Sequence, residues 1–274
     1  MSFSSISAVV ISKNEERMIA NCLDSLTWCD EVLVIDNGSE DSTLELAQRQ
    51  GAQVEEMKKA TFAELRNRGL EKASKEWILY VDADERVTPS LKSDIQKSIQ
   101  SSTRAAFSIP RNNIHYGKWM QYGGWNKDNV VRLFRRKALN QWLGDVHEHA
   151  EFQGELGTLS ESLVHLTHRN MLDGLQKTID WTKIEAQLLF ASNHPKITGL
   201  RLIKVSIYEF IRRLFLNKGW KDGVEGVIEA MVQAMNRFIV YEQLWEMQRK
   251  PPLDETYTKI EKEIHRLWEL EEKK

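Results

Sequence analysis

The sequence predicts an α/β fold, in which a mostly parallel sheet is flanked by helices and followed by a C-terminal α-helical extension. In the first ninety residues, short apolar runs rich in β-branched residues alternate with segments of helical period. This alternation is typical of parallel βαβ units with right-handed crossovers. The apolar runs are nearly continuous, which indicates strands that are covered by helices on both faces.

Each element follows from a change of period along the chain. Strands are expected at residues 6–12, at 31–39 up to a turn that stops the strand, at 52–56 and at 77–81, and helices are expected at 13–26, 41–50 and 62–73. Met18, Cys22 and Leu26 fall on one face of the first helix. A further helix is expected to begin at Thr88-Pro89-Ser90, because proline is favoured in a first helical turn.

An acidic motif ends the fourth strand. The apolar run 77–81 leads directly into Asp82, Asp84 and Glu85. Residues i and i+2 of an extended chain point the same way, so Asp82 and Asp84 are expected to converge on one ligand past the carboxyl end of the strand. Such oxygen ligands suit Mg²⁺ or Mn²⁺. The alternative is a solvated turn that precedes the next helix.

Four separate segments carry a family resemblance, namely Val10–Glu16, Val34–Thr43, Phe62–Asn67 and Val81–Glu85. In this order they resemble family 2 glycosyltransferases, which have the Rossmann-like GT-A fold. Three shorter motifs, Arg132–Arg135, Val146–Glu148 and His165–Arg169, resemble bacterial lipopolysaccharide core β-1,4-glucosyltransferases. The resemblance covers residues 1 to about 190. We therefore expect a GT-A domain at 1–190 and a helical extension at 191–274.

The resemblance implies an inverting sugar transfer. The donor is expected to be a UDP-sugar, with glucose as the sugar, and the acceptor a hydroxyl of a cell-envelope glycan such as lipopolysaccharide core, either a glycolipid or an oligosaccharide. A divalent cation, Mg²⁺ or Mn²⁺, is expected to neutralise the leaving diphosphate. Asp84 is its expected ligand, and Asp82 faces the ribose or reaches the metal through water. Glu85 either supports these groups or is a solvated cap, and we expect the cap.

Nucleotide recognition is expected at the carboxyl ends of the first strands. Asp36 is a candidate acceptor for the uracil imide, with an Asx-type turn at Asn37-Gly38 as the alternative. Glu15 would bind ribose or base, or else it is a charge favoured by a helix N-terminus. Arg66 offers a planar fork for phosphate or base, and its alternative is a surface salt bridge on a helix.

A third metal ligand is expected from His165 or His168, which follow an apolar pair. The related subgroup resembles His-Tyr-Thr-Tyr-Arg at this place, so His165 matches its histidine and His168 stands where an aromatic residue is usual. This departure leaves the choice between the two histidines open.

An inverting transfer also needs one general base near the acceptor hydroxyl. Glu148 is the expected base, Asp145 is the second candidate, and His147 would orient the carboxylate; a polar loop is the alternative reading. The segment 116–125 holds aromatic residues and glycines, and it is expected to form a wall against the acceptor sugar unless its rings serve only for packing.

The C-terminal part has the pattern of long helices at residues 170–191, 199–216 and 254–272, and an apolar stripe runs from 224 to 238. Breaks are expected at Gly219-Trp220 and Pro251-Pro252. The helix 199–216 is amphipathic and basic, so it would lie on an anionic membrane surface. Alternatively, its apolar face packs on the catalytic domain or on a second copy in a homo-oligomer.

Bulk composition narrows the classes of function. The chain has 274 residues with 38 basic and 40 acidic side chains, so no overall field favours nucleic acid. Cys22 and Cys29 match no zinc or redox spacing and are expected to be inert thiols in a reducing compartment. No signal peptide and no transmembrane run are expected. The expected location is the cytoplasm, with peripheral contact at the inner face of the membrane.

Two functions from other classes are the alternatives to a glycosyltransferase. A sugar-nucleotide-forming nucleotidyltransferase usually has a glycine-rich, basic loop after its first strand, whereas this chain has Ser12-Lys13-Asn14-Glu15-Glu16. A catalytically inert sugar-nucleotide-binding scaffold would not need to keep the acidic and histidine motifs that are present here.

Overall fold

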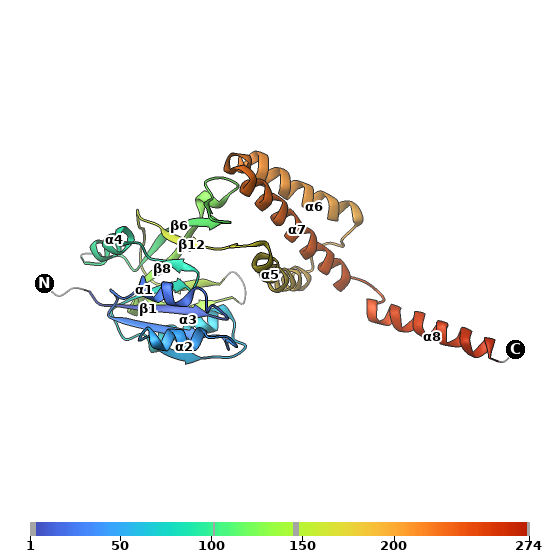
Figure 1. Ribbon diagram of the computed structural model, residues 1–274, viewed down its shortest axis with the longest axis horizontal. Helices are drawn as coiled ribbons and strands as arrows, with labels where there is room; N and C mark the ends of the chain where they lie inside the picture. Colours follow the sequence, from blue (N-terminus) through green and yellow to red (C-terminus); the bar gives the residue numbers. More distant parts are fainter. Residues whose placement is uncertain (1–3, 101, 145–147, 273–274) are drawn as a thin grey trace. The chain divides into compact units, whose positions relative to one another are not determined.

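The computed structural model describes residues 4–100, 102–144 and 148–272 of the chain. It consists of two compact units, residues 1–169 and 170–274, and each is described by itself (Figure 1). The boundary expected from the resemblance lay at residue 190. The structure groups the helix α5 (Met171–Ala191) with the second unit, because Thr178 and Glu185 of α5 bond to Asn236 and Arg237 of α7 (Gly223–Met247).

The first unit is built on a sheet with the strand order β3-β2-β1-β4-β8-β6-β12-β5, to which β7 and β11 add beside β6. Its strands are β1 Ile6–Ser12, β2 Glu31–Asp36, β3 Gln53–Glu56, β4 Trp77–Asp82, β5 Glu85–Arg86, β6 Ala106–His115, β7 Lys118–Trp119, β8 Asn129–Arg135, β11 Leu156–Thr158 and β12 Leu163–Leu166. A separate hairpin pairs β9 (Leu139–Leu143) with β10 (His149–Phe152).

The predicted fold class is confirmed. The strands β3, β2, β1 and β4 run parallel to one another. The strand β8 runs antiparallel to both β4 and β6, so the other half of the sheet is mixed. The strong periodicity of the first ninety residues gave the parallel half, whereas the later strands are short and bulged, and their pairing is non-local.

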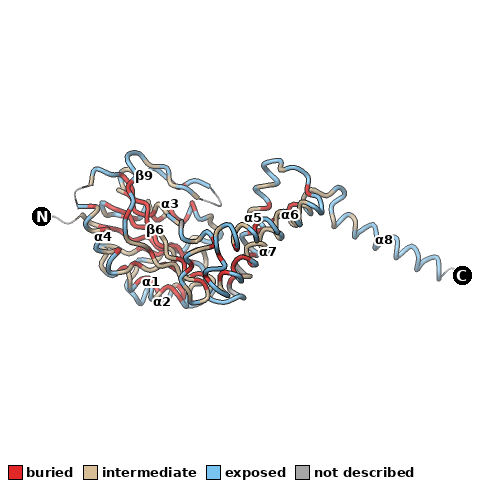
Figure 2. Tube along the Cα trace, turned by 90° about the horizontal axis from the view of Figure 1, so that it is seen from above, coloured by how far each residue is buried: buried red, intermediate tan, exposed pale blue. Residues whose placement is uncertain are grey.

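Helices cover both faces of this sheet, as the continuous apolar strands indicated. The helices are α1 Ile19–Asp24, α2 Thr43–Arg49, α3 Phe62–Lys72 and α4 Pro89–Gln100. Val10 of β1 belongs to the buried cluster that includes residues of α1 and α4, and its neighbours Val9 and Ile11 belong to the cluster on the α3 side. Figure 2 shows the buried residues concentrated along the strands.

Two local features shape the first unit. The helix α1 begins only at Ile19, later than expected, because the chain before it is fastened to the loop after β2; Asn14 there has a φ of 54°. Helix α3 approaches β1 closely at Gly69, where an added Cβ would lie 2.3 Å from Cγ1 of Val9. Both cysteines are free, and burial raises the pKa of Cys22 and of Cys29, as expected for inert thiols.

The second unit is helical. It contains α5, α6 (Gly199–Ile211), a π-helical turn Arg212–Leu216, a 3-10 turn Gly219–Asp222, α7 and α8 (Leu253–Glu271), so both predicted breaks are confirmed. Its core is small and centres on Ala186, Ile197, Val240 and Leu244. The helix α8 buries none of its residues (Figure 2). Within the described residues, no helix is long and apolar enough to cross a membrane.

Candidate active site at the carboxyl edge of the sheet

The parallel strands β1, β2 and β4 end side by side. Ser12 pairs with Asp36, and Ile11 pairs with Asp82, so the ends of the three strands lie at one edge of the sheet. In open α/β sheets this carboxyl edge is where ligands bind. The sequence motifs that were predicted to carry chemistry therefore share one edge of the first unit.

Asp36 is fully buried and anchors the turn after β2. Its Oδ2 accepts hydrogen bonds from the hydroxyls of Ser12 at 2.8 Å and Ser39 at 2.6 Å, and its Oδ1 accepts one from the Ser39 amide at 2.7 Å. These bonds form the Asx-type turn that was the alternative interpretation of Asp36. Its predicted contact with the base stays a prediction.

The loops after β1 and β2 are tied together around Glu15. The Glu15 amide donates to Oγ1 of Thr43 at 2.8 Å, and the Glu16 amide donates to Asp41 at 3.1 Å. The Glu15 carbonyl accepts from the amides of Met18 and Ile19, both at 2.8 Å, just before and at the start of α1. The backbone of Glu15 therefore fixes the entry to α1, and the predicted role of its side chain in ribose or base binding stays a prediction.

Asp82 lies between two buried arginines. Its Oδ1 accepts from Nη2 of Arg66 at 3.0 Å, and its Oδ2 accepts from Nη2 of Arg132 at 2.6 Å. Burial raises the pKa of Asp82, but the charges of Arg132 and Arg66 outweigh it, and the pKa lies below its usual range. Burial and the charge of Arg66 lower the pKa of Arg132. The strand therefore presents Asp82 as an anion that is held in place by its neighbours.

Arg66 connects Asp82 to Glu148. Its Nε donates to Oε1 of Glu148 at 3.1 Å, and its guanidinium carbon lies 5.0 Å from the ring centre of Trp142 and 5.7 Å from that of Tyr80. Only about 1% of Arg66 is exposed, so the alternative of a surface salt bridge is wrong. The helix α3 instead carries Arg66 under the carboxyl edge, where two carboxylates from distant parts of the chain compensate its burial.

Glu148, the expected base, is thus brought next to the acidic motif. In the described part of the chain, both contacts between Arg66 and Glu148 go to Oε1. The second candidate, Asp145, and the orienting residue His147 lie outside the described residues.

Glu85 is not the solvated cap that the sequence suggested. Its side chain is fully buried, accepts a hydrogen bond from the Asp82 amide at 2.9 Å and pairs with Arg111 at 3.2 Å. Burial and the charge of Asp82 raise its pKa. Arg111 also pairs with Asp128 at 2.8 Å. Glu85 is buried because the chain turns sharply after Asp82 and the short strand β5 directs its side chain inward.

The same turn separates the directions of Asp82 and Asp84. Because Ala83 and Asp84 form a turn and not a strand, the argument from extended spacing does not apply to them. Asp82 points to the arginines, whereas Oδ2 of Asp84 lies 3.4 Å from Nε2 of His165. Strand β12 pairs with β5 and places His165 opposite Glu85, which brings the histidine to the acidic turn.

The surroundings of His165 suit a metal ligand. Its Nδ1 lies 2.6 Å from Oδ1 of Asn113, and the amide nitrogen of Asn113 donates to Asp128 at 2.9 Å. Since an amide oxygen only accepts, Nδ1 carries the proton, and Nε2 is the ring nitrogen that faces Asp84 and would bind a metal. Burial lowers the pKa of His165, but the hydrogen bond and charge of Asp84 outweigh it, and the pKa is raised.

These donors fit a divalent cation. Two ligand atoms bound at about 2.1 Å and at right angles lie about 3 Å apart, close to the Asp84–His165 separation. An oxygen and an imidazole nitrogen are also a donor set that Mn²⁺ accepts. The described ion pairs around the turn join five carboxylates to three arginines and His165; they are Asp82, Asp84, Glu85, Asp128 and Glu148, with Arg66, Arg111 and Arg132.

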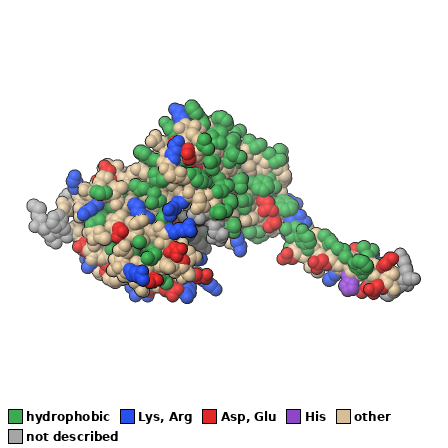
Figure 3. All heavy atoms as spheres, in the orientation of Figure 1, with side chains coloured by type: hydrophobic (Ala, Val, Ile, Leu, Met, Phe, Trp, Pro, Cys, Tyr) green, Lys and Arg blue, Asp and Glu red, His purple; other side chains and the backbone are tan. Residues whose placement is uncertain are grey.

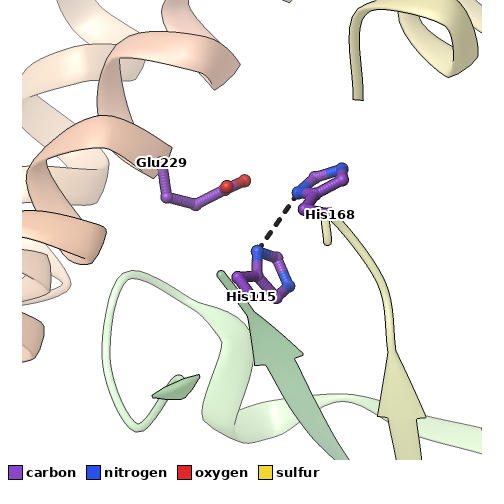
Figure 4. A group of neighbouring side chains, drawn as sticks. All are labelled: His115, His168 and Glu229. Carbon is purple, nitrogen blue, oxygen red and sulfur yellow. Dashed lines mark hydrogen bonds between the residues drawn. The ribbon is translucent and has the colours of Figure 1, made fainter. Parts of the chain in front are cut away.

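His168 takes part in a different cluster. Its Nδ1 lies 3.2 Å from Nδ1 of His115, and the two rings meet edge to face (Figure 4). The ring of Trp125 packs against His115 with the centres 4.5 Å apart. Of the two histidines that the sequence left open, the structure brings His165 to Asp84 and places His168 beside His115.

Two tryptophans of the segment 116–125, which was expected to form a wall against the acceptor sugar, lie in different surroundings. Trp125 packs against histidines, whereas Trp119 is 50% exposed and borders a cavity of about 390 Å³. Polar side chains line much of the rest of this cavity, among them Arg111, Asn112, Gln121, Asn126, Asp128, Asn129 and Ser162. An open indole beside hydroxyl, amide and carboxylate groups is suited to a sugar ring.

Sequence reasoning missed several residues of the site. Arg132 stood within a quoted motif, but no role was assigned to it. No sequence motif marked Arg111, Asn113 or Asp128 as part of the site. Single polar residues in strands are common, and the partners of these three lie far away in the sequence. Asn113, for example, contacts His165 across 52 positions.

Comparison with known proteins agrees with this architecture. The profile described as Glycosyl transferase family 2 matches residues 7–212. The lipopolysaccharide core biosynthesis glycosyltransferase LpsC of Rhizobium meliloti (strain 1021) is 27% identical over 267 residues, which cover 91% of this chain and 96% of LpsC. An uncharacterized glycosyltransferase of Rickettsia conorii is 25% identical over 249 residues, covering 85% of this chain and 87% of the relative.

Among solved structures, that of glucosyl-3-phosphoglycerate synthase from Mycobacterium tuberculosis in complex with Mn²⁺, uridine diphosphate and phosphoglyceric acid is 16% identical. It matches with a TM-score of 0.46 and covers 68% of this chain and 78% of that one. The family profile spans most of the chain, including the acidic turn, Glu148 and His165. The chain therefore belongs to glycosyl transferase family 2.

Proposed function

We propose that this glycosyltransferase is an inverting, metal-dependent hexosyltransferase that moves a sugar, glucose in our proposal, from a UDP-sugar to a hydroxyl of a cell-envelope glycan. The observation that carries the proposal is the link Glu148–Arg66–Asp82. It holds the candidate base Glu148 beside the acidic turn at the carboxyl edge of the sheet, where the donor would bind.

The donor side of the proposal rests on the acidic turn. Asp84 and His165 would hold Mg²⁺ or Mn²⁺, which would neutralise the charge that develops on the departing diphosphate. Asp82 is already fixed by Arg66 and Arg132, so it would position the ribose rather than bind the metal directly. Asp36 and Glu15 lie at the ends of the neighbouring strands, where they would contact the base and the ribose.

On the acceptor side, Glu148 would take the proton of the attacking hydroxyl at a carboxylate oxygen. The acceptor oxygen forms a bond to the anomeric carbon while the bond from that carbon to the diphosphate oxygen breaks, so UDP leaves and the configuration inverts. Arg66 keeps the Glu148 carboxylate in place during this transfer. No covalent bond to the protein is needed.

The proposed class of acceptor is supported by one of the relatives. LpsC, which matches along nearly the whole chain, is named for lipopolysaccharide core biosynthesis. We propose an acceptor of the same class, a lipopolysaccharide core glycan. The cavity beside Trp119 would hold its sugar, because an exposed indole stacks on the apolar face of a sugar ring.

The test uses two carboxylate-to-amide changes in the full chain. Glu148→Gln should bind UDP and Mn²⁺ almost normally in calorimetric titrations, while sugar transfer falls by on the order of a hundredfold or more. Glu151→Gln is the matched control, since Glu151 is an exposed carboxylate on the adjoining strand β10 and should transfer sugar at the parent rate.

Each other outcome has a distinct meaning. Loss of nucleotide binding in Glu148→Gln would place Glu148 in the donor site, and a normal transfer rate would exclude it as the base. Asp84→Ala should lose metal-dependent turnover of UDP-sugars with unchanged thermal unfolding. A parent protein that binds UDP with Mn²⁺ but turns over no member of a UDP-sugar panel would be an inert scaffold. If the parent protein instead forms a nucleoside triphosphate from a UDP-sugar and pyrophosphate, it is a nucleotidyltransferase.

A further inference from the structure

The second unit has an apolar surface that its own core does not use. On α6, the side chains of Leu200, Ile203, Ile207 and Ile211 are all exposed, Leu200 by 77%. They follow one another at intervals of three or four residues, which places them along one side of the helix. We use the name hairpin face for this side of α6, its continuation on α7 and the turn 212–222 that joins the two helices.

The continuation on α7 has the same character. Val224, Met231 and Met235 are exposed there, Val224 by 70%. Figure 3 shows hydrophobic side chains gathered over α6 and α7 on the face that it presents. Exposed apolar patches of this extent mark sites of interaction with a partner or a membrane.

The turn between the two helices adds aromatic and basic residues. Phe215, Leu216 and Trp220 are exposed at this turn, and Lys218 and Lys221 are exposed beside them. The Nζ of Lys221 lies 5.7 Å from the ring centre of Trp220. Aromatic rings next to lysines are typical of segments that enter the interface of a bilayer, since the ring reaches the acyl boundary and the ammonium group stays with the headgroups.

The charge of this segment identifies the partner. Residues 199–222 contain six basic side chains and two acidic ones. Both acids, Glu209 and Asp222, are buried, and Glu209 is paired with Arg212 and Arg213. The surface that reaches solvent is therefore positive around an apolar centre, which complements an anionic lipid surface.

The helix α8 shows that exposed apolar side chains alone do not identify a surface that binds an anionic membrane. Ile260, Ile264, Leu267 and Trp268 are also exposed along α8. However, residues 253–271 contain six acidic side chains against three basic ones, so an anionic bilayer would repel this helix. The two surfaces differ in charge and not in hydrophobicity, and α8 is a control within the same chain.

We propose that the hairpin face docks on an anionic lipid bilayer, with Phe215 and Trp220 at the point of entry and Lys218 and Lys221 at the headgroups. This inference does not depend on the proposed catalytic function. A lipid-anchored acceptor would give the docking a purpose, but the surface would bind lipid in an inactive variant as well.

The experiment measures co-sedimentation of the full chain with phosphatidylcholine vesicles and with vesicles that also contain phosphatidylglycerol. Binding is expected to the anionic vesicles only, and it should weaken as salt is added. The double substitution Lys218→Glu/Lys221→Glu should weaken binding by on the order of tenfold or more, and Phe215→Ser/Trp220→Ser should do the same.

Matched variants on α8 are the controls. Lys259→Glu/Lys262→Glu and Leu267→Ser/Trp268→Ser should bind anionic vesicles like the parent, and so should the inactive Asp84→Ala. Circular dichroism and thermal unfolding check that each variant is folded. The proposal is overturned by equal binding to both kinds of vesicle, by binding to neither, or by α8 variants that lose as much as the hairpin variants. A dimer in light scattering that Phe215→Ser/Trp220→Ser converts to a monomer, without an effect on vesicles, would assign the face to a second copy instead.

Discussion

Replacing Arg66 with methionine should strongly destabilise the first unit, because the substitution removes a buried charge. Arg66 is buried, and its guanidinium compensates the carboxylates of Asp82 and Glu148. Methionine keeps much of the length and apolar volume of the side chain, so the packing against Tyr80 and Trp142 is largely retained. What is lost is the charge, and the two carboxylates then face a site with less compensation.

The size of the effect can be worked from the geometry. Hydrogen bonds to charged groups contribute about 1.5–3 kcal/mol each, which gives about 3–6 kcal/mol for the bonds to Asp82 and Glu148. The Asp82 and Glu148 side chains keep 23% and 14% of their surface exposed, and Asp82 retains Arg132, so water and Arg132 recover part of this. We expect a loss of about 3 kcal/mol, the lower end of the range for breaking a buried ion pair.

Hydrogen exchange followed by mass spectrometry measures this loss in each unit separately. The opening free energy of peptides from β4 should fall by the expected amount, and that of peptides from α7 should not change. Arg68→Met is the matched control: Arg68 lies on the same helix and also pairs with two carboxylates, Glu55 and Glu71, but on the surface, so it should cost little. Equal losses for Arg66→Met and Arg68→Met, or unchanged protection of β4, would refute the reasoning.

Three further predictions concern other parts of the first unit. Gly69→Ala should lower the free energy of unfolding in urea by more than about 1 kcal/mol, despite the helical preference for alanine, because its Cβ would collide with Val9; a more stable variant would contradict this packing. Asn113→Ala should weaken Mn²⁺ binding about ten- to a hundredfold in calorimetry, because it removes the partner of Nδ1 of His165, and unchanged affinity would point to other ligands. Burial raises the pKa of Asp94, but hydrogen bonds from the loop after β11 outweigh it and lower the pKa. Asp94→Asn should therefore be less stable than the parent above about pH 4, and acid titration of stability should show the difference vanishing as the pH falls through the lower folded-state pKa.

The local elements were predictable from the sequence because their signals are local. The run 6–12 became β1 with the same bounds, and the helix expected at 62–73 became α3, Phe62–Lys72. Apolar periodicity and capping act within one or two turns of chain, as in the capping box formed by Thr61 and Glu64. The entry to α1 was misjudged because hydrogen bonds from another loop, and not local propensity, decide where that helix begins.

The candidate site was predictable only as a set of residue types at one edge of a sheet. The acidic turn and Glu148 were chosen from the sequence, and His165 was one of two histidines between which the sequence left the choice open. Their partners were not, because a charge in a sequence carries no sign of whether it is solvated or paired. Glu85 was expected to be a solvated cap, and a surface salt bridge was one of two interpretations of Arg66. Both residues are buried, since each meets its counter-charge across a long stretch of chain.

The sequence by itself therefore determined the alternation of strands and helices in the first ninety residues, the parallel half of the sheet and the edge at which chemistry is placed. Only the tertiary structure decided that Asp82 points to Arg66 and Arg132 while Asp84 points to His165, and that Asn113 holds the imidazole. The physical reason is that apolar patterns are read over a few residues, whereas the compensation of a buried charge depends on which distant side chain the fold brings within about 3 Å of it.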